Sequence, residues 1–132
     1  MTEQIEQFFQ NMHDEMCLYA SQEQNKPFPF SRAETAAYQD WINFTNNSTN
    51  YFECDDLPFD YDIPNYVRTI RQAGIIKIAI TDHSTGLMRA LHAFHQCGYD
   101  IVSVCDVVRH EKRWNGEQET IQPGILLSAV KD

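Results

Sequence analysis

Hydrophobic residues recur at steps of three and four along the N-terminal part of the chain, which predicts a helix over residues 2–21. The apolar stripe consists of Ile5, Phe8, Phe9, Met12 and Met16. The acidic residues of this segment fall mostly on the opposite, solvent-facing side. Pro27 and Pro29 end the pattern, because proline disfavours helical geometry at its own position and in the residue before it.

A second helix is predicted after the two prolines. Ser31 and Glu34 stand in the capping-box arrangement, in which two side chains satisfy two backbone N–H groups at the start of a helix. An apolar stripe that includes Trp41 continues to about Asn46. The polar run over residues 46–50 is then typical of a loop.

From residue 63 onward, helical patterns alternate with runs of β-branched residues. Gly74 and Gly98 are placed to end two helices, because glycine readily adopts the left-handed conformation that follows a helix. The Asn-Gly pair in "WNGE" predicts a tight hairpin turn. The expected elements are a helix over 63–73, a strand over 75–80, a helix over 87–97, a strand over 99–110 and a strand over 125–130, with a bulge or strand start at Pro123–Gly124.

These elements predict an α+β fold, or a small α/β fold, in a single domain over residues 1–132. Two acidic N-terminal helices would pack on a βαβ unit, and a C-terminal β-hairpin would extend that unit into a three-stranded mixed sheet. Short connections through a helix join parallel strands, so we expect strands 75–80 and 99–110 to run parallel with a right-handed crossover. The parts of the domain are the acidic helices over 1–50, an acidic-aromatic loop over 51–62 and the remainder over 63–132.

Charge is distributed unevenly along the 132 residues, whose formal net charge is -9. Residues 1–62 hold 12 acidic and 2 basic residues and so carry -10, whereas residues 63–132 hold 7 acidic and 8 basic residues and carry +1. An N-terminal half without basic clusters is not suited to direct binding of nucleic acid or an anionic membrane. The pattern favours a protein partner with a basic surface or a homo-oligomer. The alternative is that acidic helices only keep the protein soluble.

Other totals limit the class of protein. Hydrophobic residues make up 42% of the chain, which indicates a packed core. No apolar run approaches the length that spans a bilayer, and the N-terminus lacks the pattern of a signal peptide, so we expect a cytoplasmic protein. The cysteines show no C-x-x-C spacing, which predicts buried, reduced thiols and no zinc knuckle. They are Cys17, Cys54, Cys97 and Cys105.

The stretch "YFECDDLPFDYDIP", residues 51–64, interleaves aromatic rings with carboxylates and contains no base. One interpretation is an irregular segment whose rings anchor it to the core while its carboxylates face water. The other is a surface that offers rings and charges to a basic protein, in an inhibitory or nucleic-acid-mimicking role. The candidate partner-binding residues are Phe52, Glu53, Asp55, Asp56, Phe59, Asp60, Tyr61 and Asp62.

The turn "TDHSTG", residues 81–86, connects a predicted strand with a predicted helix. Its Asp-His-Ser tripeptide is no catalytic triad, because adjacent side chains point in different directions, and the P-loop and dinucleotide patterns are absent. Backbone N–H groups at a helix N-terminus favour anions, so Ser84, Thr85 and Gly86 are candidates for binding a phosphate or carboxylate. The alternative is that Asp82 or Ser84 simply caps the helix.

Metal and thiol chemistry are not favoured by the pattern. His92, His95 and Cys97 share a helix but fall on different flanks of its apolar stripe, so we expect no metal ion there, and no cofactor. Cys105 lies in mid-strand with no marked base, and we expect it to be buried. The basic run over residues 109–114 either contacts nucleic acid or an acidic surface, including that of a second copy, or protects the hairpin from edge pairing.

Residues 60–104 contain a proline-capped helix, an R-x-A-G-I helix end and a T-D-x-S-T-G-L-M turn. With these motifs the segment resembles short uncharacterised acidic proteins of conjugative elements and phages of gut Firmicutes. The resemblance implies a mobile-element context and no known activity, so it assigns no functional residue.

We therefore expect a non-enzymatic cytoplasmic interaction protein that binds a basic protein surface through residues 51–62. The first alternative is a domain that binds a small ligand, nucleotide or anion at residues 81–86. The second is an uncharacterised structural subunit.

Overall fold

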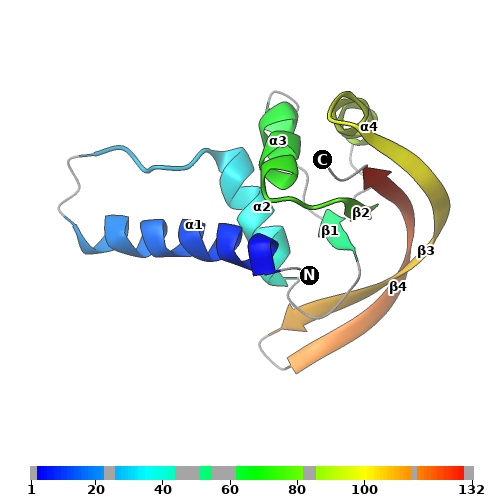
Figure 1. Ribbon diagram of the computed structural model, residues 1–132. Helices are drawn as coiled ribbons and strands as arrows, with labels where there is room; N and C mark the ends of the chain where they lie inside the picture. The colour runs from blue at the N-terminus through cyan, green and yellow to red at the C-terminus, as the bar shows by residue number, and fades with distance from the viewer. Residues whose placement is uncertain are drawn as a thin grey trace.

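The computed structural model describes residues 3–22, 26–43, 51–54, 62–81, 86–113 and 116–129. In these residues the chain forms an α+β fold with four helices and a four-stranded mixed sheet. Figure 1 shows helices α1 to α3 on the inner side of a long, curved β-hairpin, with α4 near one end of it. In chain order the elements are α1 (Glu3–Ser21), α2 (Arg32–Asn43), β1 (Phe52–Cys54), α3 (Ile63–Gln72), β2 (Lys77–Ile80), α4 (Leu87–Gln96), β3 (Tyr99–Arg113) and β4 (Gly116–Ala129).

The two N-terminal helices form as the hydrophobic pattern predicts. Helix α1 buries the centre of the predicted stripe. At the start of α2 the backbone N–H of Glu34 donates to the Ser31 hydroxyl at 3.2 Å, and the backbone N–H of Ser31 donates to the Glu34 carboxylate at 2.9 Å. The predicted end of α2 near Asn46 lies outside the described residues. No described helix is both long and apolar enough to cross a bilayer.

Helices α3 and α4 begin at Ile63 and Leu87, where the sequence predicts them to begin, and each ends one residue before its predicted end. Gly74 after α3 and Gly98 after α4 have φ angles of 87° and 90°, which are conformations that glycine adopts without strain. The N-cap of α4 is Gly86, with no side-chain hydrogen bond to the helix. The alternative in which Asp82 or Ser84 occupies the N-cap is therefore wrong, because the N-cap lies two residues after Ser84.

The sheet has the strand order β1-β2-β4-β3 and not the three strands predicted from the sequence. The unpredicted strand is β1, which runs parallel to β2 with Phe52 opposite Ile78. All three residues of β1 are buried. A three-residue strand is too short to be recognised in a sequence, where the signal is an alternation or an apolar run over at least four residues.

Strands β2 and β3 run in the same direction, as predicted, because each pairs antiparallel with β4. They are not neighbours, however, since β4 lies between them: Ile78 is opposite Leu127, and Leu127 is opposite Ile101. The C-terminal strand therefore inserts into the predicted βαβ unit and does not extend it at an edge. The adjacent parallel strands are β1 and β2, which α3 connects.

Strands β3 and β4 pair along their whole length, from Tyr99 opposite Ala129 to Arg113 opposite Gly116. The predicted Asn-Gly turn lies between them and falls partly outside the described residues. The predicted bulge or strand start at Pro123–Gly124 is wrong, because both residues lie within β4. The register shift occurs in β3, between Ile101 and Ser103. The polar first half of β4 shows no apolar alternation, because it pairs within a ribbon that extends past the rest of the sheet and needs no buried face (Figure 1).

One hydrophobic core includes residues from every helix and strand. Phe9 of α1 stacks on Trp41 of α2, with ring centroids 5.1 Å apart, and on Phe52 of β1 at 6.2 Å. Phe94 of α4 packs edge-on against Tyr99 of β3 at 5.3 Å. Aromatic contacts therefore join the acidic helices to the sheet.

Candidate functional site

The structure describes only three of the candidate partner-binding residues in the acidic-aromatic segment, and two of them are buried. Phe52 and Glu53 lie in β1 with 0% and 1% of their surface exposed, so these two residues do not form an exposed binding surface. Asp62 is half-buried at the N-cap of α3, where its side chain makes no capping hydrogen bond. The other candidates lie outside the described residues: Asp55, Asp56, Phe59, Asp60 and Tyr61.

A different surface that combines acidic and aromatic side chains lies between α1 and α2. It is a groove of about 550 Å³, lined by Glu3, Glu6, Gln7, Gln10 and Trp41. The four residues from α1 share one face of the helix, because they are separated by steps of three and four, and all four are exposed. We call this feature the acidic groove.

Trp41 forms the aromatic wall of the acidic groove. Its indole stacks on the buried ring of Phe9 with 15° between the ring planes, which fixes its position. The indole Nε1 is buried and meets no hydrogen-bond acceptor in the described part of the chain. A buried indole N–H usually has an acceptor, so this unpaired donor is an unusual feature of the described residues.

The walls of the acidic groove are also held by polar contacts. The Tyr66 hydroxyl of α3 donates to the Asp40 carboxylate of α2 at 2.5 Å, and both side chains are buried. Burial and the adjacent Asp40 carboxylate raise the pKa of Tyr66 well above its usual range. The Tyr38 hydroxyl and His13 Nδ1 share a hydrogen bond of 2.7 Å between α2 and α1. Helix α2 is therefore tied to both neighbouring helices.

The sequence indicated the parts of the acidic groove separately. Glu3 and Glu6 were assigned to the solvent side of the first helix, and Trp41 to the apolar stripe of the second. Their meeting depends on the stack between Phe9 and Trp41, which brings together residues far apart in the chain. No short motif carries that information.

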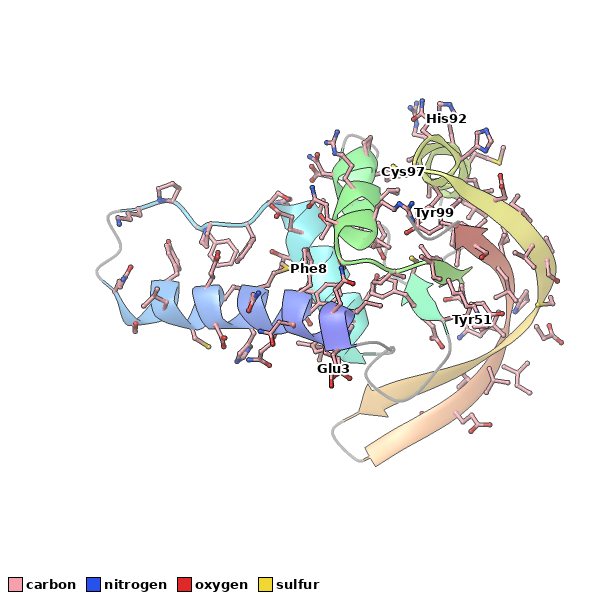
Figure 2. All side chains as sticks on the ribbon, in the orientation of Figure 1. Glu3, Phe8, Tyr51, His92, Cys97 and Tyr99 are labelled. Atoms are coloured by element: carbon pink, nitrogen blue, oxygen red, sulfur yellow. The ribbon has the colours of Figure 1, made fainter. Side chains whose placement is uncertain are left out.

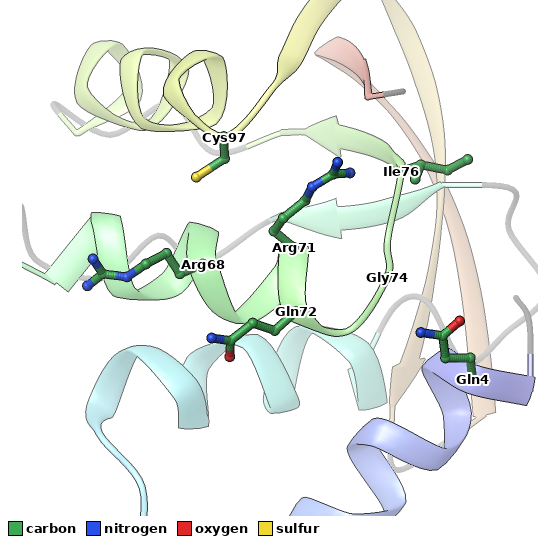
Figure 3. A pocket seen from close by; sticks show the side chains of 7 residues that line it. All are labelled: Gln4, Arg68, Arg71, Gln72, Gly74, Ile76 and Cys97. Carbon is green, nitrogen blue, oxygen red and sulfur yellow. The ribbon is translucent and has the colours of Figure 1, made fainter. Parts of the chain in front are cut away.

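A second cavity, of about 330 Å³, opens beside α3 and the end of α4 (Figure 3). Its lining residues are Gln4, Arg68, Arg71, Gln72, Gly74, Ile76 and Cys97. The Arg71 guanidinium lies over the Tyr99 ring, 5.6 Å from the centroid. None of the described lining residues is acidic, although the chain carries a net charge of -9. We call this cavity the arginine pocket.

The predicted anion-binding turn is described only in part. Ser84 and Thr85 lie outside the described residues. Gly86 is buried, and its carbonyl accepts a 2.9 Å hydrogen bond from the backbone N–H of Ala90. The described end of the turn thus begins α4, and the anion-binding role of the turn stays a prediction.

The histidines of α4 do not gather with Cys97. Figure 2 shows His92 on the outer side of α4 and Cys97 on the side towards α3. His95 Nδ1 lies 3.7 Å from the Asp100 carboxylate. Within the described ranges, no three histidine, cysteine or acidic residues are placed together so as to hold a metal ion.

The expectation of buried thiols is correct for Cys54 but wrong for the other cysteines. Cys17 and Cys105 are exposed, and Cys97 is half-buried at the arginine pocket. Cys105 is exposed, although Val107 on the same side of β3 is buried. A mid-strand position brings burial only where other elements cover the strand.

Comparison with known proteins identifies the domain and no activity. Neither curated proteins nor solved structures give a match. A family model described as a domain of unknown function, DUF7698, matches residues 36–129. The match includes Trp41 and leaves α1 outside. Because it covers more than half of the chain, the protein belongs to the DUF7698 family.

Proposed function

We propose that this protein is a non-enzymatic interaction protein that binds a basic segment of another protein in the acidic groove. The observation that carries the proposal is that Glu3, Glu6 and Trp41 line one groove. Lysine and arginine side chains fit this combination, because carboxylates attract their charge and an indole ring attracts a cation over its electron-rich face.

The surroundings of the groove favour a cationic partner. Helix α1 contains Glu3, Glu6, Asp14 and Glu15 and no lysine or arginine. The negative electrostatic potential of these residues speeds the approach of a basic partner and repels an acidic partner. The indole N–H of Trp41 adds a donor for a backbone carbonyl of the bound segment. The groove therefore offers charge, ring surface and one directed hydrogen bond.

The predicted acidic segment extends this proposal. Asp55, Asp56 and Asp60 add three carboxylates to the same half of the chain, and we propose that they contribute to the attraction of the basic partner. We also propose that the protein acts in the bacterial cytoplasm as the product of a mobile element. The resemblance of residues 60–104 to proteins of such elements supports that context.

The test compares two double variants of equal charge. Binding of a fluorescent peptide in which lysine and arginine alternate with glycine is measured by anisotropy at low salt. Glu3→Gln with Glu6→Gln removes the two carboxylates of the groove, and Asp14→Asn with Glu15→Gln removes two others from the same helix. We expect the first variant to lose about tenfold in affinity, and the second much less, because pairs at a solvated surface each contribute up to about 1 kcal/mol.

Equal losses from the two double variants would mean that only net charge matters and that the groove is no site. An acidic peptide of the same length serves as the ligand control and should not bind. Circular dichroism of both variants shows whether α1 is retained, so that a lost helix is not mistaken for lost binding.

A second candidate function is binding of a small anion in the arginine pocket. The favouring observation is that two arginines, Arg68 and Arg71, line a cavity that has no carboxylate among its described lining residues. Arg71 is held over the Tyr99 ring, so it loses little freedom on binding. Phosphate and carboxylate groups match guanidinium geometry through paired hydrogen bonds.

Thermal unfolding in inorganic phosphate tests this candidate. Phosphate at about 100 times its dissociation constant adds roughly 2.7 kcal/mol and raises the unfolding temperature by several degrees. Phosphate also stabilises proteins without binding them, so the shift supports a site only if Arg71→Gln removes it and Arg89→Gln retains it. Arg89 is an exposed arginine on α4 that does not line the pocket. An equal shift in all three proteins would exclude the pocket.

A further inference from the structure

The β3–β4 hairpin exposes an unusual amount of aliphatic surface. Val104 is 74% exposed, Ile121 70% and Val108 45%. Ile101 and Val102 are exposed as well. An isolated exposed aliphatic residue needs no explanation, but a row of them along one element marks an interaction site.

Three of these side chains lie on one face of the hairpin. Val108 is directly opposite Ile121, and directly opposed residues project to the same side of the sheet. Val104 lies four positions before Val108 on the same strand and therefore shares that side. We call Val104, Val108 and Ile121 the hairpin face.

Strand β3 is also an edge of the sheet. It is the last strand in the order β1-β2-β4-β3, and it pairs only with β4 in the described part of the chain. Its 15 residues span about 50 Å at roughly 3.3 Å per residue. An edge strand presents a row of backbone N–H and C=O groups that can pair with another strand, and proteins usually shorten such edges or place lysine there. The register shift near Val102 interrupts only the beginning of this edge.

The charges along β3 are complementary to the same strand read in reverse. The first half of the strand carries Asp100, the central residue is Asp106, and the last half carries Arg109, Lys112 and Arg113 with one acid, Glu111. In an antiparallel pair of identical strands, the beginning of each lies beside the end of the other. Asp100 of one strand then lies beside the basic half of its mate, whereas a parallel pair would place the basic halves together.

We infer that β3 is a self-association edge, at which two copies of this chain pair their β3 strands antiparallel about a two-fold axis. Pairing joins the two four-stranded sheets into one sheet of eight strands. Each copy supplies the same edge, as symmetry about a two-fold axis requires. The hairpin faces of the two copies become adjacent across the junction. A second copy fits this edge better than an unrelated strand does. An identical strand that runs antiparallel necessarily presents the same charges in the opposite order.

The association state of the purified protein tests the inference. Sedimentation velocity over a roughly hundredfold range of concentration should show a monomer–dimer equilibrium, because dimers form by mass action. Val104→Lys and Val108→Lys, on the edge strand, should each weaken the dimer at least tenfold. Ile121→Lys, on the same face but on the inner strand β4, should weaken it much less. Met88→Lys changes an equally exposed residue of α4 and should have no effect.

Neutralising Asp100 tests the strand direction. Asp100→Asn should weaken an antiparallel dimer, although it lowers the overall repulsion between two acidic chains. Asp14→Asn makes the same change in net charge on α1 and should leave the dimer unchanged or slightly stronger. A stronger dimer in the Asp100→Asn variant would overturn the antiparallel pairing.

Three other results would overturn the inference. The first is a monomer at every concentration, which would leave the edge for a strand from a different protein. The second is an equal effect of Ile121→Lys and Val104→Lys, which would indicate stacking of hairpin faces without edge pairing. The third is a dimer that Val104→Lys and Val108→Lys leave intact. Peptide binding to the acidic groove is measured separately, so failure of either proposal leaves the other standing.

Discussion

The hydroxyl of Tyr66 donates a 2.5 Å hydrogen bond to the carboxylate of Asp40 where neither side chain has more than 2% of its surface exposed. The bond joins α3, which follows β1 in the chain, to α2, which carries Trp41. A carboxylate is costly to bury unless a donor meets it, so this bond stabilises one particular packing of the two helices. The position of the acidic groove depends on that packing.

Tyr66→Phe should lower the free energy of unfolding by about 1–3 kcal/mol, because it takes a donor away from the buried Asp40 carboxylate without changing the ring. Urea unfolding followed by circular dichroism measures the loss. The same substitution in an Asp40→Ala background should cost clearly less, since the two residues are directly coupled. If Tyr66→Phe costs the same in both backgrounds, the hydrogen bond contributes nothing to stability.

Stability should fall on the alkaline side as buried tyrosines titrate. Burial raises the pKa of Tyr99 from 10.0 to about 12, partly opposed by Arg71, and burial also raises that of Tyr66. A tyrosine with a higher pKa in the folded state holds its proton more tightly there, so its stabilising effect is complete below pH 10 and is lost as the pH rises towards 12. Urea midpoints on both sides of pH 10 measure this decline.

Tyr99→Phe supplies the control for the alkaline decline, since it removes one of the titrating groups. The variant should lose less stability between pH 10 and 12 than the unchanged protein does. An identical slope in the two proteins would show that Tyr99 keeps an ordinary pKa in the folded state.

Much of the helical structure could be predicted from local chemistry. The stripe of α1, the Ser31–Glu34 capping box and the glycines after α3 and α4 all depend on residues a few positions apart. These features can therefore be recognised from short stretches of the sequence. The α+β class and the hairpin followed from the same local patterns.

The sheet order and the acidic groove could not be predicted in this way. Strand β1 is defined by its pairing with β2, far along the chain, and its three residues are too few to be recognised as a strand. Strand β4 pairs with both β2 and β3, and the pattern of apolar residues does not specify which strands pair with each other. The acidic groove likewise exists only because Phe9 stacks on Trp41.

The presence of Gly124 has a different structural reason from the bulge or strand start that the sequence predicts. It was expected to mark a bulge or a strand start, yet it lies within β4 where a Cβ atom would sit 2.7 Å from Val107 Cγ2 and 3.1 Å from the Ile80 carbonyl oxygen. The glycine therefore permits close approach of neighbouring strands. Its backbone conformation is not the reason, since its φ is not positive.

Gly124→Ala should destabilise the protein by about 1–3 kcal/mol, as is usual when atoms are forced into a packed site. Thermal or urea unfolding measures the change. In a Val107→Ala background the added methyl group meets only the Ile80 carbonyl as a close contact, so its cost should be smaller. An equal cost in both backgrounds would show that Val107 moves aside freely and that the strand spacing does not depend on Gly124.

Trp41→Phe separates the two properties that the indole brings to the acidic groove. Phenylalanine keeps an aromatic ring on Phe9 but lacks the buried Nε1–H, which has no acceptor in the described part of the chain. Losing that N–H removes no hydrogen bond among the described residues, so the substitution should cost only the packing of the smaller ring, about 1–2 kcal/mol. The affinity for the lysine–arginine peptide should nevertheless fall several-fold, because the bound segment loses its directed donor. Fluorescence anisotropy and urea unfolding on the same variant provide the two values. A variant that loses stability but binds the peptide unchanged would show that Trp41 belongs to the core and that the carboxylates of α1 bind without it.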